Sequence, residues 1–425
     1  MSDDRRLEPG TGNAPASPER EWTFMVYLAG DNNLEHFGRE DLQEMKEVGS
    51  TSEVAIVAQF DRMQEGATRR YYLRQGTTLE EDEVGPPLGE TNTGDPGELV
   101  HFLAWATATY PAKRYALVLW NHGTGWKEDD VYKVSQRLKI QASQLQERRL
   151  RDIAESISQA KRPPLFLTPV HAIFARGIAY DDTSQDFLDN AELKRALSCS
   201  LLLAGIPQLD LLGFDACLMN MIEVAYQVKD FVSYLVGSEE TEPGGGWPYT
   251  AILQELVNRP QMQGDELAHT IVQKFLEAYS EEETLTQSAL DLSQIPLVAE
   301  AINALCAYVL ENPDECELII GRAARRAQKF SDPDYRDLYD FCRLVYQYAD
   351  KVPALQERAQ AVMETLWPPE EGRLVIAEGH KGYRMRQVYG VSIYFPQYEM
   401  SPFYKRLDFA SETLWDDMLH QLFGI

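Results

Sequence analysis

Five short apolar runs, separated by segments of helical character, constrain the fold of this 425-residue chain more than any other feature. They are Trp22–Ala29, Val54–Phe60, Tyr115–Trp120, Leu209–Phe214 and Phe231–Gly237. Continuous apolar runs of this length are typical of strands that are buried on both faces. Because helical segments alternate with them, the sequence predicts an α/β fold whose mostly parallel sheet is flanked by helices on both faces.

The remaining segments differ from this pattern and suggest a domain organisation. Residues 1–21 are polar and rich in Gly, Pro and Ser, so we expect a disordered leader before a domain over 22–249. Residues 127–170 carry nine Lys and Arg against six Asp and Glu, and we interpret them as a basic insertion in that domain. Residues 250–425 are dominated by helical patterns with a few strand-like stretches, which predicts a C-terminal, mainly helical α+β domain.

Composition excludes several classes of partner. The chain has 67 acidic and 40 basic residues, a formal net charge of −27, which would repel nucleic acid and anionic membranes and favour basic partners. The longest uncharged apolar candidate for a membrane span, Ala196–Leu209, is too short and contains Pro207. No apolar signal core is seen near the N-terminus, and the five cysteines are odd in number and scattered. We therefore expect a cytoplasmic protein with free thiols.

Two side chains that can act in catalysis follow neighbouring apolar runs of the expected sheet. His122 comes directly after Tyr115–Trp120, and Cys217 follows Leu209–Phe214 at the start of an expected helix over 217–229. The carboxyl ends of parallel strands meet at one edge, so the two side chains are expected to lie together as base and nucleophile. A helix start at Cys217 would lower the pKa of its thiol. The alternatives are a polar loop histidine and a small buried cysteine.

These residues lie in longer motifs that resemble the clostripain family of cysteine peptidases, which belongs to the caspase-like clan. The resemblance is carried by WTFMVYLAGDNNLE at 22–35, LVLWNHGTGW at 117–126, AYDDTSQDFLDNAELKRAL at 179–197 and LDLLGFDACLMN at 209–220. It implies a caspase-like arrangement of the sheet and its helices.

The resemblance also implies a role for each site residue. His122 would be the general base and acid, and Cys217 the nucleophile that forms an acyl-enzyme. The backbone N–H groups of Gly123 and Cys217 would form the oxyanion hole. Asp215 would bind a substrate Arg or Lys side chain, with a helix N-cap as its alternative role.

Two further acidic residues, Glu239 and Glu240, each have two possible roles. Glu239 and Glu240 follow the fifth run, where they line the same substrate pocket or lie in a solvated loop. We assign no metal site and no cofactor. Because some relatives depend on calcium, the resemblance makes the carboxylates of Asp31, Asp181 and Asp182 candidate calcium ligands, although their spacing is not that of an EF-hand.

The expected function is a cysteine endopeptidase that cleaves basic peptides or proteins after Arg or Lys. Self-processing is expected within the basic insertion, at Arg148, Arg149 or Arg151. The alternatives are a non-catalytic caspase-like scaffold that binds basic peptides, and a hydrolase of small amides.

Overall fold

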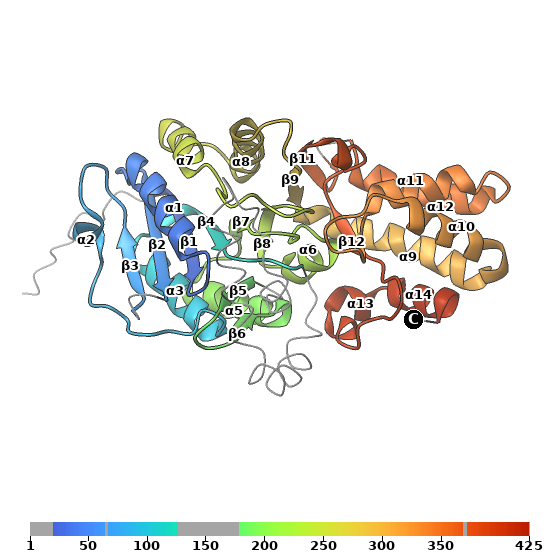
Figure 1. Cartoon of the computed structure of the whole chain (residues 1–425), viewed down its shortest axis with the longest axis horizontal. Helices are drawn as coiled ribbons and strands as arrows, with labels where there is room; N and C mark the ends of the chain where they lie inside the picture. The colour runs from blue at the N-terminus through green and yellow to red at the C-terminus, as the bar shows by residue number, and fades with distance from the viewer. Residues whose placement is uncertain (1–19, 64–66, 126–177, 369–371, 425) are drawn as a thin grey trace, which may run out of the picture.

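The computed structural model describes residues 20–63, 67–125, 178–368 and 372–424, and these residues form one eight-stranded sheet with helices around it (Figure 1). The expected leader, apart from its last residues, and the basic insertion lie outside the described residues. The five central strands are parallel to one another, which confirms the five predicted runs. The outer strands pair antiparallel with their inner neighbours. The strand order is β11 (Val375–Lys381), β9 (Leu285–Asp291), β8 (Val232–Gly237), β7 (Leu209–Asp215), β4 (Ala112–Trp120), β1 (Arg20–Gly30), β2 (Val54–Arg62) and β3 (Arg69–Tyr72).

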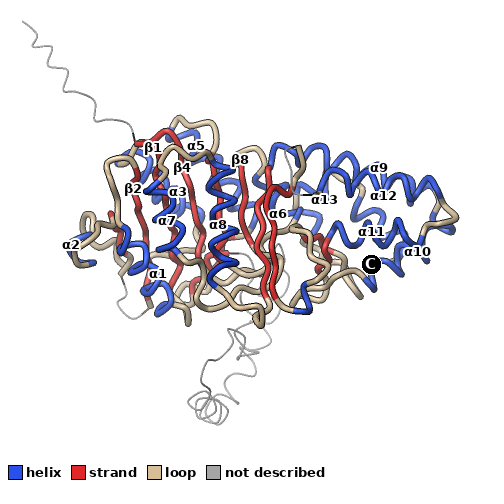
Figure 2. Tube along the Cα trace, turned by 90° about the horizontal axis from the view of Figure 1, so that it is seen from above, coloured by secondary structure: helices blue, strands red, loops and turns tan. Residues whose placement is uncertain are grey.

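Helices cover both faces of this sheet, as predicted (Figure 2). Along β1 the side chains alternate between two apolar cores, with Trp22 and Phe24 in one core and Met25 and Tyr27 in the other. The first core is closed by α1 (Glu35–Val48), α7 (Tyr249–Asn258) and α8 (Gly264–Ala278). The second is closed by α3 (Pro96–Thr109), α5 (Asn190–Ala204) and α6 (Ile222–Val228).

The sheet continues past residue 249, where the sequence suggested a domain boundary. β9 and β11 both come from the C-terminal region and extend the sheet at one edge. β9 escaped prediction because its centre is polar, yet Thr286, Gln287 and Ser288 are all buried. Helices gather beyond β11 (Figure 1): α9 (Ile295–Glu311), α10 (Pro313–Arg326), α11 (Leu338–Tyr348), α12 (Pro353–Leu366), α13 (Asp408–Glu412) and α14 (Trp415–Phe423).

Short elements complete the described part of the chain. β10 (Tyr335–Asp337) and β12 (Ser392–Tyr394) form one small antiparallel pair, and β5 (Ile178–Asp181) and β6 (Asp186–Leu188) form another. α2 (Leu79–Asp82) and the 3-10 turns Leu292–Gln294, Tyr383–Met385 and Tyr404–Arg406 lie in the connections.

One helical stretch in the described residues, Leu292–Glu311, is long and apolar enough to cross a membrane by length and composition. It comprises α9 and the turn before it, and Ile302, Leu305 and Val309 are buried in the larger apolar core. α9 packs against α12 and α14 there, so burial within the protein accounts for its apolar character.

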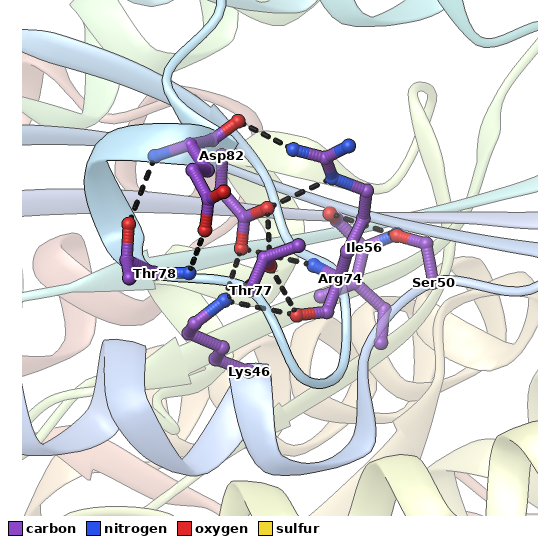
Figure 3. Close-up of polar contacts among 8 residues, drawn as sticks. Lys46, Ser50, Ile56, Arg74, Thr77, Thr78 and Asp82 are labelled. Carbon is purple, nitrogen blue, oxygen red and sulfur yellow. Dashed lines mark hydrogen bonds and ion pairs between the residues drawn. The ribbon is translucent and has the colours of Figure 1, made fainter.

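A buried carboxylate holds the loop after β3 against α1 (Figure 3). Lys46 Nζ lies 2.5 Å from Asp82 Oδ2, and Arg74 Nε lies 2.9 Å from Asp82 Oδ1. Thr77 donates a further hydrogen bond to the same carboxylate. Burial alone would raise the pKa of Asp82, but the hydrogen bonds from Lys46, Thr77 and Arg74 lower it. Asp82 is thus a fully partnered buried acid.

The centre of the sheet provides a test of this packing. A Cβ on Gly213 in β7 would lie 2.5 Å from Trp247 Cη2, so Gly213→Ala should lower the free energy of unfolding by about 1–3 kcal/mol in urea titrations. Gly237→Ala on neighbouring β8 is the matched control, because its Cβ would meet no atom closer than 3.6 Å. Equal stability of the two variants would contradict the close packing of Trp247 on β7.

Candidate active site

Two neighbouring strands deliver His122 and Cys217 to the same edge of the sheet. Trp120 on β4 pairs with Asp215 on β7, and Asn121 N–H donates to the Asp215 carbonyl oxygen at 3.3 Å. His122 and Cys217 each stand two residues beyond this pair, as the sequence predicted. The loops that carry them are in contact, because a Cβ on Gly123 would lie 2.3 Å from the Cys217 carbonyl oxygen.

The Cys217 thiol is buried, with 7% of the residue exposed. Its Sγ accepts a hydrogen bond from Glu242 N–H at 3.2 Å. Burial raises the pKa of the thiol to about 12, and the nearby carboxylates of Glu242, Glu240 and Asp215 add to this rise. The resting thiol is therefore protonated at neutral pH.

The expected helix over 217–229 is wrong at its start. α6 begins at Ile222, and Leu218 takes a positive φ of 64° in the loop between. Cys217 therefore gains no stabilisation of its thiolate from a helix N-terminus, since that effect is confined to the first turn. A protonated thiol at this place must be activated by other groups.

The His122 ring is held by a side chain that sequence reasoning missed. His122 Nε2 lies 2.8 Å from Asn33 Oδ1. In the tautomer whose Nε2–H donates to this amide oxygen, Nδ1 is the basic nitrogen of the ring. Asn33 lies in the turn after β1, inside the GDNN stretch, whose polar residues at a strand end were the available signal.

Two backbone donors in these loops are unused. Among the described residues, neither Gly123 N–H nor Cys217 N–H donates a hydrogen bond to another protein group. Unused N–H groups beside a nucleophile are what an oxyanion hole requires.

Asp215 is the last residue of β7, two positions before Cys217, and is almost completely buried. Its Oδ2 accepts hydrogen bonds from Trp247 N–H at 3.2 Å and from the Tyr249 hydroxyl at 2.9 Å. Burial raises the pKa of Asp215 to about 6. The N-cap alternative is wrong, because the residue before α6 is Met221 and Asp215 bonds elsewhere.

Asp215 belongs to a set of buried carboxylates that we call the acidic pocket: Asp41, Asp215 and Glu242. Burial raises the pKa of Asp41 to about 9, with the charge of Asp215 adding to the effect. Burial and Asp215 also raise the pKa of Glu242. Neither Glu242 oxygen forms a hydrogen bond of normal geometry, and the same holds for the side-chain amide of adjacent Gln287. Buried acids without a basic partner are stabilised when a cation binds to them.

Glu242 was missed by sequence reasoning, which pointed to its neighbours Glu239 and Glu240. The structure places the Glu239 carboxylate against the C-terminal region, where Oε2 accepts from Gly390 N–H at 3.1 Å. The Glu240 carboxylate accepts from Ser331 N–H at 3.0 Å. Both residues are buried rather than solvated, and these hydrogen bonds tie the loop after β8 to the C-terminal region.

The carboxylates considered as metal ligands separate into two groups. Asp181 is satisfied by protein donors, since Oδ2 accepts from Thr93 N–H and Oδ1 from Ser184 N–H. Asp31 instead joins Asp61 and Glu90, and one ligand oxygen from each of these three lies within 4.8 Å of the others.

Comparisons with known proteins agree with this geometry. The clostripain family model matches residues 26–159 and 168–421. Clostripain of Hathewaya histolytica is 25% identical over 277 residues, which are 59% of this chain and 45% of that protein, so the chain matches less than half of its length.

Two solved structures share the fold at lower identity. A secreted C11 cysteine protease from Bacteroides thetaiotaomicron, bound to an irreversible peptide inhibitor, has a TM-score of 0.61 at 20% identity and covers 93% of this chain and 100% of its own. An inactive zymogen C11 protease from Parabacteroides distasonis has a TM-score of 0.62 at 20% identity and covers 93% and 98%. The extent of the family match, over nearly the whole described chain, shows that this protein belongs to the clostripain family.

Proposed function

We propose that this chain is a cysteine endopeptidase that cleaves peptide bonds after arginine or lysine. The observation that supports the proposal is the register of β4 and β7, because it brings the loops that carry His122 and Cys217 into contact at one edge of the sheet, close to the buried carboxylates of Asp215 and Glu242. Membership of the clostripain family supports the same activity.

The reaction follows from the groups at the sheet edge. His122 Nδ1 takes the proton of the Cys217 thiol, and the thiolate attacks the scissile carbonyl carbon. The N–H groups of Gly123 and Cys217 stabilise the oxyanion that forms. The imidazolium then protonates the leaving amine, the C–N bond breaks, and an acyl-enzyme remains. A water molecule deprotonated by His122 hydrolyses the thioester and restores the thiol.

A basic substrate side chain also activates the nucleophile in this proposal. Asp215 and Glu242 raise the pKa of the Cys217 thiol by their negative charge. A guanidinium or ammonium group bound between them neutralises that charge and so lowers the thiol pKa. Substrates with a basic residue therefore gain in rate as well as in binding.

The resting thiol supports a latent enzyme that is matured by cleavage. Gly125 packs against Met221 beside the site, and Ile178 begins β5 next to β1 and β4, so the segment that joins them starts and ends near His122. We place the cleavage at Arg148, Arg149 or Arg151, which lie outside the described residues. A neutral thiol also suits the alternative function, a scaffold that binds basic peptides without cleaving them.

Hydrolysis of model peptides distinguishes the proposed peptidase from a scaffold that only binds peptides. Wild-type protein should release dye from fluorogenic peptides with Arg or Lys before the scissile bond and should yield two fragments on a denaturing gel. Cys217→Ala should lose turnover and stay as one chain of 48.3 kDa, because the proposed reaction has no other nucleophile. Cys199→Ala is the control, since Cys199 is exposed on α5 and should leave both results unchanged. Turnover by Cys217→Ala, or a wild type that binds basic peptides without cutting them, would contradict the proposal.

The acidic pocket provides a separate test of specificity. Asp215→Asn and Glu242→Gln should each lower kcat/KM for an Arg substrate by a factor of hundreds or more, because a buried guanidinium without its carboxylate costs about 3–5 kcal/mol. Asp230→Asn, an exposed acid after α6, is the matched control and should leave kcat/KM unchanged. If the pocket variants cleave Arg peptides as fast as wild type, the basic specificity is wrong.

A further inference from the structure

The loops after β4 and β8 both contact one short segment of the C-terminal region. This segment, residues 331–335, lies between α10 and α11, and we call it the bridging segment. At one end, the Tyr335 hydroxyl donates a hydrogen bond to the Thr124 carbonyl oxygen at 2.6 Å. At the other end, Ser331 N–H donates to the Glu240 carboxylate at 3.0 Å. The bridging segment therefore joins two loops whose strands are separated by β7 in the sheet.

The contact of Tyr335 lies close to His122. Tyr335 is fully buried, and a Cβ on Gly125 would lie 2.9 Å from its hydroxyl oxygen. The hydroxyl is thus packed against the backbone of the loop after β4 and also bonded to it. Because Thr124 is two residues from His122, this bond restrains the backbone that carries the imidazole ring.

The other end of the bridging segment is connected to Cys217. The carbonyl oxygen of Glu240, whose carboxylate accepts from Ser331, also accepts from Leu218 N–H at 3.0 Å. Leu218 directly follows Cys217, and Glu242 N–H in the loop after β8 donates to Cys217 Sγ at 3.2 Å. The loop after β8 therefore connects the bridging segment to Cys217 and to the residue that follows it.

The bridging segment is itself held firmly by the chain around β12. Tyr335 pairs with Tyr394 in the β10–β12 pair, and the Asp334 carbonyl oxygen accepts from Phe395 N–H at 2.7 Å. Asp334 Oδ1 accepts from Gln397 N–H at 3.0 Å. A segment that is fixed by backbone pairing can position a loop that contacts it, whereas loops without such contacts are the more mobile parts of a fold.

We propose that Tyr335 is a positioning residue for the reaction, because it holds the loop of His122 through the Thr124 carbonyl oxygen. Proton transfer from the Cys217 thiol requires the reacting atoms to lie about 3 Å apart, and a displacement of about 1 Å can cost about 100-fold in rate. Asn33 holds the imidazole ring itself, whereas Tyr335 holds the backbone from which the ring projects. The role in the reaction rests on the proposed function, whereas the effect of Tyr335 on the position of His122 does not.

The kinetics of Tyr335→Phe test the role in the reaction. The variant removes only the hydroxyl group, so kcat for an Arg peptide should fall about 10- to 100-fold. KM should change less than about twofold, because the acidic pocket is untouched. Tyr226→Phe is the matched control, since it also removes a bonded hydroxyl from a buried tyrosine, at the contact of Tyr226 with Glu412 on α13. It should lose a similar amount of stability in urea titrations and keep the wild-type kcat.

The NMR signal of the His122 ring tests the positioning without any cleavage. The Cys217→Ala protein, which cannot process itself, is labelled with ¹³C-histidine, and the Cε1–H resonance of His122 is identified by its loss in His122→Ala. Tyr335→Phe in this background should move that resonance, because the ring changes its surroundings when its loop is released. Tyr226→Phe should leave it in place.

Three results would overturn the proposal. One is a wild-type kcat in Tyr335→Phe, and another is an unmoved His122 resonance in the same variant. The third is an equal loss of kcat in Tyr335→Phe and Tyr226→Phe, which would show only a general effect of lower stability. If the wild type cleaves no peptide, the proposed function fails, and the NMR comparison alone decides whether Tyr335 positions His122.

Discussion

The pairing of Trp120 with Asp215 is the constraint on which the site depends. It fixes the register of β4 against β7, and therefore how far each strand runs before its loop begins. The backbone hydrogen bonds of five parallel strands and two apolar cores hold that register, since a slip by one residue would turn Val118 or Phe214 to the wrong face. The hydrogen-bonded register of β4 and β7 therefore brings the loops of His122 and Cys217 together.

Electrostatics at the same edge would allow the proposed peptidase site to combine latency with specificity for basic residues. The carboxylates of Asp215 and Glu242 are buried without a basic partner among the described residues, and they oppose ionisation of Cys217. A substrate that brings its own positive charge removes this opposition. In the proposed mechanism, the unfavourable burial of acids in the free protein would favour basic substrates, because a neutral side chain cannot offset it.

The C-terminal region is part of this arrangement rather than a separate attachment. Asn220, three residues after Cys217, donates from its side chain to the Gly390 carbonyl oxygen at 2.9 Å, and Ser392 N–H donates to the Asn220 carbonyl oxygen at 3.1 Å. Glu239 accepts from Gly390 N–H in the same place. The loop that carries Cys217 is therefore held on one side by β7 and on the other by the segment that leads into β12.

Apolar runs and strand ends were sufficient to predict the central sheet and the placement of His122, Cys217 and Asp215. Three features could not be predicted from these two signals. β9 is buried yet polar, because Thr286 bonds to the backbone of Glu239 and Glu240 rather than to water. The start of α6 depends on the positive φ of Leu218, which no residue type there signals. Glu242 and Asn33 act through contacts with chain far away in sequence, which spacing alone does not reveal.

The central claim is that an ionised Asp215 in a buried pocket receives a basic side chain, and the pH dependence of benzamidine binding tests it most directly. Benzamidine stays cationic throughout this range, and Asp215, with a pKa of about 6, loses its charge as the pH falls. Calorimetry on the Cys217→Ala protein should therefore show affinity about 10-fold weaker at pH 5 than at pH 7.5. Asp215→Asn should abolish most of the binding at both values. Benzamidine affinity that is independent of pH, or tighter at pH 5, would contradict the account.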